Sequence, residues 1–309
     1  MKYFILITCF SFASISLAQF SNFNSQRNWS LNKKEIIGGL GATQFTGDLG
    51  GRNLIGKDFS MVDIDFPTTS IGGFIGYRYR FHPYFATSTT LNFGMLRGDD
   101  SQTNEIIRNS RNLHFRTLYF EMQQRIEVIF WANEKFQSRG SSRGKSKYRN
   151  DRVYLFTGLG VSFFNPKAKY HDEWIALRPL KTEGQGLVGG ADQTKPLTMT
   201  IPIGIGFRMA VSKVWSLGIE ATYIKTFSDY IDDVHGVYFD PSKLYSPEAQ
   251  YLSNPSYNNT SWFAPGQQRG DENKDAYYTL NIVASRNITY KYKGGSRNRI
   301  QWSSGRYKF

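Results

Sequence analysis

Hydrophobic and polar residues alternate along LYFEMQQRIEVIFW, which spans residues 118–131. The apolar residues recur at every second position, whereas a helix would space them three and four apart. They are Leu118, Phe120, Met122, Ile126, Val128 and Phe130. Because successive side chains of a strand point to opposite faces, the segment predicts a β-strand with Glu121, Arg125 and Glu127 on its polar face.

The same period of two recurs along the chain and gives eight candidate strands. Besides the first, they cover roughly 36–46, 70–81, 85–95, 153–163, 199–211, 215–223 and 278–290. Two links, at 82–84 and 212–214, are tight turns, whereas those at 49–69, 97–112, 165–196 and 229–275 are long and polar. This pattern predicts an all-β fold: an eight-stranded antiparallel transmembrane β-barrel over 35–293, with short periplasmic turns and long extracellular loops.

A soluble β-sandwich would also show alternation, with its apolar faces sharing one core. Two features favour the barrel instead. The polar faces mix charge with Gly, Ala and Ser, as a narrow lumen filled by side chains requires. Aromatic residues gather at the short-turn ends and predict a girdle at the membrane interface. The girdle residues are Phe81, Tyr84, Phe130, Trp131 and Trp215.

Composition and the N-terminal segment agree with an exported β-protein. Aromatic residues make up 16% of the chain, and there are 29 glycines. Residues 1–18 have a basic residue, an apolar stretch and a small-residue end, which predicts a signal peptide cut after Ala18. The single cysteine, Cys9, lies inside it, so the mature chain could form neither a disulfide nor a thiolate zinc site. Residues 19–34 and 294–309 would be periplasmic, the latter a basic tail.

The charged residues on the polar faces would share the lumen. An eight-stranded barrel is just wide enough inside for side chains, and buried ions must pair. We therefore expect a plug rather than a channel, with Arg125 pairing with Glu121, Glu127 or Glu220; a catalytic or gating role is the alternative. The predicted ion-pair network is Arg78, Arg80, Glu121, Arg125, Glu127, Arg208 and Glu220.

Two basic segments, 138–152 and 296–309, stand on the expected periplasmic side. Such charge is often merely solvated, but it would also suit an acidic protein surface or anionic lipid headgroups. Nucleic acid is not expected as a partner outside the cytoplasm, despite a net charge of +13. The predicted partner-contact residues are Arg139, Arg143, Lys145, Lys147, Arg149, Arg297, Arg299, Trp302, Arg306 and Tyr307, and Phe309 is a further apolar anchor.

Metal and catalytic motifs are weak. Acidic residues at 229–240 and 271–275 would suit calcium, but neither segment has the glycine and closing glutamate of a calcium loop, so we expect ordered loops and no metal or cofactor. His114, His171 and His235 could meet Asp232 or Asp233 in a hydrolase, although no motif supports one. We expect no enzyme; a lipid or protein hydrolase and a narrow porin are the alternatives.

Four segments resemble the PorG-like outer-membrane barrels of Bacteroidetes: 35–51, 111–122, 163–187 and 225–244. The first reads EIIGGLGATQFTGDLGG and the last KTFSDYIDDVHGVYFDPSKL. The resemblance implies a non-enzymatic outer-membrane component of the type IX secretion and gliding machinery. It also implies partners: a periplasmic ring lipoprotein of the PorK/GldK type and its companion of the PorN/GldN type. The barrel would anchor this ring.

Overall fold

The computed structural model describes residues 29, 32–49, 68–103, 105–135, 149–212, 214–257, 261–271 and 273–289. The strands are β1 Lys34–Thr46, β2 Ser70–Arg80, β3 Phe85–Asp99, β4 His114–Lys135, β5 Arg149–Tyr170, β6 Glu173–Ala176, β7 Leu197–Ala210, β8 Trp215–Thr226 and β9 Ala276–Asn287. The expected signal peptide at 1–18, most of the segment at 19–34 and the tail at 294–309 lie outside the described residues.

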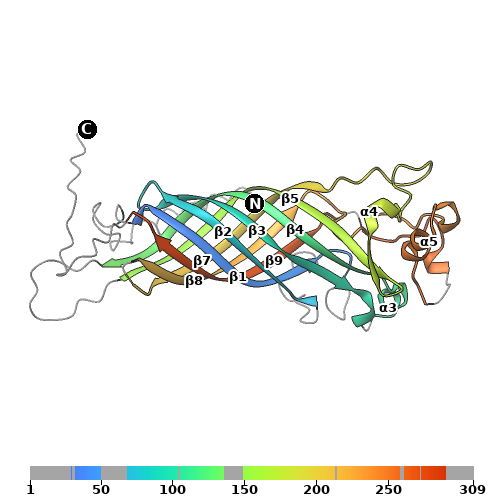
Figure 1. Ribbon diagram of the computed structural model, residues 1–309, viewed down its shortest axis with the longest axis horizontal. Helices are drawn as coiled ribbons and strands as arrows, with labels where there is room; N and C mark the ends of the chain where they lie inside the picture. Colours follow the sequence, from blue (N-terminus) through green and yellow to red (C-terminus); the bar gives the residue numbers. More distant parts are fainter. Residues whose placement is uncertain are drawn as a thin grey trace, which may run out of the picture.

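Eight of these strands close into one barrel (Figure 1). Each pairs antiparallel with its neighbours, β9 pairs with β1, and the pairing of β4 with β5 completes the circuit. β6 is a short addition that pairs with the end of β5. The predicted eight-stranded antiparallel barrel is therefore confirmed.

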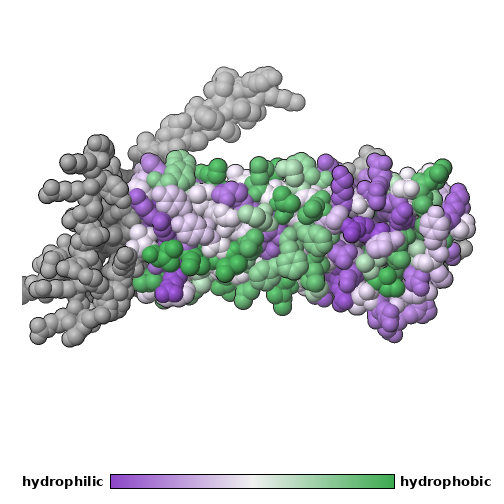
Figure 2. Space-filling view, turned by 45° about the horizontal axis from the view of Figure 1, so that its top comes forward, coloured by the Kyte–Doolittle hydropathy of each residue, from purple (hydrophilic) through white to green (hydrophobic). Residues whose placement is uncertain are grey.

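Apolar side chains cover the outside of the barrel wall. Ile71 is 79% exposed and Ile282 70%, and Figure 2 shows a hydrophobic zone around the middle of the molecule. A sandwich would bury such faces against each other, so the sandwich alternative is wrong. An apolar surface of this extent suits lipid, and closure leaves no strand edge unpaired in it. No helix in the described ranges is both long and apolar enough to cross a membrane.

Strand β4 changes face once along its length. Its register against β5 shifts between Ile129 and Trp131, with Phe130 as the extra residue of the bulge. Trp131 consequently points outward while Ile129 and Ala132 are buried. Up to Val128 the even-numbered residues of this row are exposed as predicted, and Phe130 is half-buried. The bulge then reverses the alternation, so the next even-numbered residue, Ala132, is buried.

The long links fold into an ordered structure at one end of the barrel, here called the loop cap: the described residues of 47–49, 100–113, 171–196 and 227–275. Its helices are α3 Ile106–Arg111, α4 Leu177–Leu180 and α5 Pro247–Ser253, with 3-10 turns η3 Asp100–Gln102, η4 Pro241–Lys243 and η5 Ser261–Phe263 (Figure 1). Ile231, Val234 and Leu252 of the cap share one buried cluster with Phe45 and Phe115 of the wall. The cap is thus packed onto the barrel mouth.

Candidate functional site

Glu35 of β1 is the centre of a buried charge cluster in the lumen. Its Oε2 accepts hydrogen bonds from Arg78 Nη1 at 3.1 Å and Arg208 Nη1 at 3.3 Å. Its Oε1 accepts one from Arg152 Nη2 at 2.5 Å. The Glu35 side chain is 2% exposed and that of Arg152 0%. Four strands, β1, β2, β5 and β7, thus converge on one carboxylate.

Further ion pairs extend this cluster in both directions. Arg208 Nη2 lies 2.7 Å from Glu220 Oε1, and Arg125 Nη1 lies 3.3 Å from Glu220 Oε2. On the other side, Arg78 Nε lies 2.5 Å from Glu127 Oε2. The charges alternate along the chain of contacts, so each ion has a neighbour of opposite sign. We call Glu35, Arg78, Arg125, Glu127, Arg152, Arg208 and Glu220 the lumen network.

Aromatic rings fill the space between the arginines. The Tyr154 ring centroid lies 4.9 Å from Arg208 Cζ and 5.4 Å from Arg78 Cζ, and its hydroxyl donates to Glu220. The Phe156 ring centroid lies 4.7 Å from Arg125 Cζ. These cation–π contacts stabilise guanidinium groups that have lost their water.

Between this network and the cap, the lumen is filled by polar side chains that hydrogen-bond to Glu121. Glu121 Oε2 accepts from Tyr277 Oη at 2.8 Å and from Gln123 Nε2 at 2.7 Å, and its Oε1 accepts from Thr200. A cavity of about 10 Å³ lies among Glu121, Gln123 and Tyr277. This volume suits about one water molecule, so this cavity has no room for a larger solute.

The structure places five of the predicted lumen residues in the network, and Arg125 pairs with Glu220, one of its three predicted partners. The prediction differs from the structure at Glu121 and Arg80, and it lacks two members. Glu121 is buried, but its hydrogen bonds go to Tyr277, Gln123 and Thr200, so it lies outside the network. Arg80 is buried, but its guanidinium donates to the Pro83 carbonyl at 2.5 Å and 3.2 Å, beside the β2–β3 turn. Sequence reasoning missed Glu35 and Arg152. Arg152 was assigned to the basic insert 138–152, yet β5 begins at Arg149, so Arg152 shares the inward face with Tyr154. Arg152 and Tyr154 are both even-numbered, and this alternation could have placed Arg152 on the inward face.

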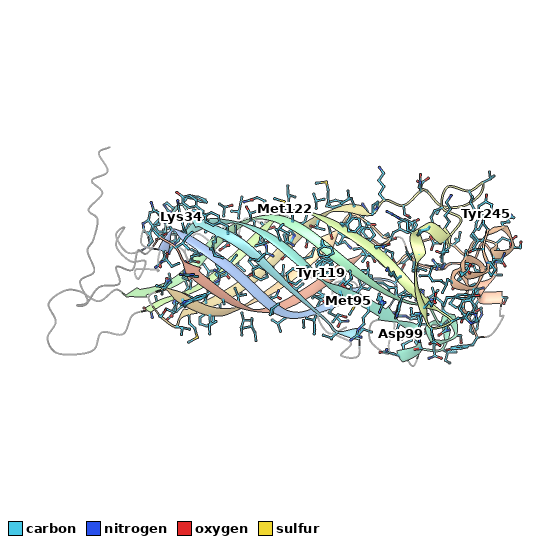
Figure 3. The ribbon with its side chains drawn as sticks, in the orientation of Figure 1. Lys34, Met95, Asp99, Tyr119, Met122 and Tyr245 are labelled. Atoms are coloured by element: carbon cyan, nitrogen blue, oxygen red, sulfur yellow. The ribbon has the colours of Figure 1, made fainter. Side chains whose placement is uncertain are left out.

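The predicted girdle residues lie at the short-turn end, which Lys34 marks in Figure 3, opposite the cap marked by Tyr245. Phe81, Trp131 and Trp215 are exposed, whereas Tyr84 and Phe130 are half-buried. The predicted partner-contact residues, including Arg139, Arg143, Lys145, Lys147, Arg297, Arg299, Trp302, Arg306 and Tyr307, lie outside the described residues; of Arg149 only the backbone is described.

The loop cap has its own buried charges. Arg269 Nη1 lies 2.6 Å from Glu183 Oε1 and donates to the Asp233 carbonyl at 2.7 Å. Thr182 Oγ1 donates to Asp233 Oδ2 at 2.6 Å. Burial raises the pKa of Glu183 to about 7, against the opposing effect of Arg269. Burial likewise raises the pKa of Asp233 to about 6.

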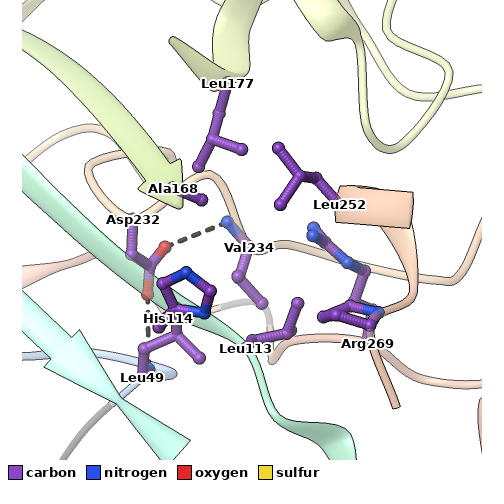
Figure 4. Close-up of a pocket in the computed structure, with 10 residues that line it drawn as sticks. Leu49, Leu113, His114, Ala168, Leu177, Asp232, Val234, Leu252 and Arg269 are labelled. Atoms are coloured by element: carbon purple, nitrogen blue, oxygen red, sulfur yellow. Dashed lines mark hydrogen bonds between the residues drawn. The ribbon is translucent and has the colours of Figure 1, made fainter. Parts of the chain in front are cut away.

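A second cavity of about 10 Å³ lies between the cap and the wall (Figure 4). His114, Asp232 and Arg269 line it together with apolar side chains. Asp232 accepts hydrogen bonds from the backbone N–H groups of Leu49 at 3.3 Å and Val234 at 3.0 Å. The carboxylate therefore organises loop backbone, and the cavity is too small for a substrate.

The three histidines of the loop end take separate structural roles. His114 Nε2 accepts from the Lys169 N–H at 2.9 Å. His171 packs against Tyr170, with 4.2 Å between ring centroids. His235 Nδ1 lies 2.5 Å from Asp229 Oδ2. His114 and Asp232 share the cavity wall, but the hydrolase arrangement in which all three histidines meet these acids does not form.

The barrel is closed, its outer wall is apolar and its lumen is filled by side chains. These three features together indicate the class of fold. The fold is that of an outer-membrane β-barrel.

No family model and no curated protein matches this chain. Among solved structures it is similar to neisserial surface protein A, with a TM-score of 0.38 and 7% identity over 82% of this chain and 97% of that one. It is similar to OprG from Pseudomonas aeruginosa at a TM-score of 0.35 and 8% identity, over 82% and 93% of the two chains. Ail from Yersinia pestis gives 0.32 and 10%, over 82% and 97%.

Proposed function

We propose that this protein is a non-enzymatic, non-conducting anchor in the bacterial outer membrane. The observation that carries the proposal is the lumen network: Glu35 alone holds three arginines across the bore. A pore would need a continuous water-filled path, and displacing buried, paired ions to open one would cost several kcal/mol. A barrel filled in this way is suited to holding other components at its ends.

The machinery we propose is the type IX secretion and gliding apparatus. Its support is the resemblance of four segments to PorG-like barrels, spread over most of the mature chain. The proposed partners are a periplasmic ring lipoprotein of the PorK/GldK type and its PorN/GldN-type companion. A lipid-anchored ring diffuses and tilts, whereas a second attachment fixes it, because tethering raises the effective concentration of a weak contact.

The proposed contacts are the insert at 135–152 and the C-terminal tail. The basic residues would attract an acidic ring surface, and Trp302, Tyr307 and Phe309 would supply apolar anchors of the kind that dominate interfaces.

The proposal that the barrel does not conduct is tested by measuring the conductance of the purified protein in planar bilayers. We expect brief, small events at most. Large and steady conductance would refute the anchor and favour the narrow porin.

Affinity purification with crosslinking from native membranes tests the partner. One variant lacks residues 297–309, and another replaces Arg139, Arg143, Lys145, Lys147 and Arg149 with glutamine. The matched control replaces the exposed loop-cap residues Lys243 and Lys274 with glutamine. We expect both test variants to insert normally but lose ring protein and secretion, with the control unaffected. Full retention of ring and secretion by both variants would refute the tether.

A further inference from the structure

Three carboxylates from three separate parts of the loop cap meet at one point. Asp48 follows β1, Asp229 follows β8 and Asp271 precedes β9. One carboxylate oxygen of each lies within 4.8 Å of the others. We call these residues the carboxylate cluster. Their separation along the sequence means that only the folded cap brings the three charges together.

Asp229 has one carboxylate oxygen that is buried without a partner. Asp229 is 8% exposed, and its Oδ2 is engaged by His235 Nδ1 at 2.5 Å. Its Oδ1 is buried and has no hydrogen-bond partner. A buried carboxylate oxygen without a partner is destabilising, and native structures rarely leave one without a ligand, water or ion.

Charges around the cluster do not cancel it. Asp232 and Asp275 are further buried acids nearby, and both add repulsion to the site. Arg111 donates to the backbone carbonyl of Asp48 at 2.8 Å, while its charge pairs with Asp100 at 2.6 Å. A cation at the cluster would relieve the repulsion between carboxylates held this close together.

We propose that Asp48, Asp229 and Asp271 bind one divalent cation of the calcium class. The ligands are all hard carboxylate oxygens on irregular loops, which calcium accommodates because its coordination is flexible, whereas magnesium demands near-ideal octahedral geometry. His235 holds Asp229 through Oδ2 and so acts as a positioning residue that leaves Oδ1 for the ion. Water and backbone carbonyls would complete the shell.

The ion would tie the loop after β1 to both ends of the long β8–β9 link. This role is independent of the proposed anchoring, since the loop cap lies at the other end of the barrel from Lys135 and Arg149, the strand ends that flank the basic insert. The Asp271 carboxylate is held in place by Asn273. Its Oδ1 accepts from the Asn273 backbone N–H at 2.7 Å, and its Oδ2 accepts from Asn273 Nδ2 at 3.1 Å.

The test is calorimetric titration of the full-length, detergent-refolded protein with CaCl₂ and, in parallel, MgCl₂. We expect one calcium per chain, with a dissociation constant of about 10⁻⁴–10⁻³ M, as in extracellular modules, and weaker magnesium binding. Asp48→Asn, Asp229→Asn and Asp271→Asn should each weaken calcium binding by at least about tenfold. The control is Asp172→Asn, an acid with a 92% exposed side chain outside the cluster, which should bind as wild type does.

Protease digestion of the loop cap with and without calcium supplies a second readout that separates binding from misfolding. Wild type should become more resistant when calcium is added. Asp229→Asn, which removes one repelling charge, should resist better than calcium-free wild type and no longer respond to calcium. The proposal fails if wild type shows neither binding heat nor protection at several millimolar calcium, if the variants bind as wild type does, or if magnesium binds equally well.

Discussion

Substitution of Glu35 by glutamine is the most direct perturbation of the lumen network. The change keeps the shape of the side chain and removes only its charge. Three arginines, Arg78, Arg152 and Arg208, would lose the carboxylate that they share. Arg78 retains Glu127 and Arg208 retains Glu220. Arg152 is the residue most affected.

The magnitude follows from what Arg152 would retain. Its side chain is 0% exposed, and its Nε and Nη1 have no hydrogen-bond partner. Removing one partner of a buried ion pair costs about 3–5 kcal/mol, because the other charge is left uncompensated. We expect Glu35→Gln to lower the free energy of unfolding by about this amount, well beyond the ~0.5 kcal/mol typical of a surface change.

Urea unfolding in lipid vesicles, followed by the heat-modifiable mobility of the barrel on gels, measures the loss. The matched control is Glu173→Gln, the same chemical change at an exposed position of β6. A double variant, Glu35→Gln with Arg152→Gln, should recover part of the loss because the stranded charge is gone. A Glu35→Gln protein within about 0.5 kcal/mol of the control would refute the view that this carboxylate neutralises the bore.

Three further predictions concern other parts of the barrel. Arg125→Leu should also cost about 3–5 kcal/mol in the same urea assay, and an unchanged midpoint would contradict its buried pairing. Gly206→Ala should cost about 1–3 kcal/mol, because a Cβ there would overlap the Tyr154 ring; a neutral effect would show that the ring can move. The pKa values of Glu183 and Asp233, raised by burial to about 7 and about 6, mean that the folded cap holds protons that the unfolded chain has released. Cap stability, measured by protease resistance without calcium, should therefore fall as pH rises from about 4 to 7 and flatten in Glu183→Gln; a rise would contradict the raised values.

The strands could be predicted because alternation is a local property. Ile71 and Ile75 point outward and Arg78 inward as their parity requires, whatever the rest of the chain does. The alternation reverses after Phe130, where one extra residue forms a bulge and the next even-numbered residue, Ala132, is buried. A bulge depends on the partner strand, so nothing in the alternating sequence of β4 marks its position.

The sequence predicts that the charged residues of the lumen form ion pairs, but not which residue pairs with which. That Arg125 needs a buried acid follows from charge alone, but which acid it meets depends on strand register and stagger. Glu35 and Arg208 are neighbours across the bore although 173 positions separate them in sequence. Glu35 also stands at the edge of a glycine-rich strand with weak alternation, so its inward orientation was not visible.

The loop cap lay beyond sequence reasoning for a different reason. Its helices are short, and its core joins residues from four links to the ends of the strands, so no local period reveals it. The acids at 229–240 and 271–275 were visible as two separate groups, but the carboxylate cluster takes one residue from each, Asp229 and Asp271, and adds Asp48, which belongs to neither group. Such convergence is a product of the tertiary fold.

The barrel is obstructed at two levels, inside its lumen and at the mouth under the loop cap. The lumen network fills the bore, and the loop cap is packed over the mouth, so removing either one alone would still leave the other in the path of a solute. β4 and β5 have 22 residues each, about twice the length that crosses a bilayer, and their far ends support the cap. Two obstructions in one barrel support the proposed anchoring role over transport, because a transport path would have to open both.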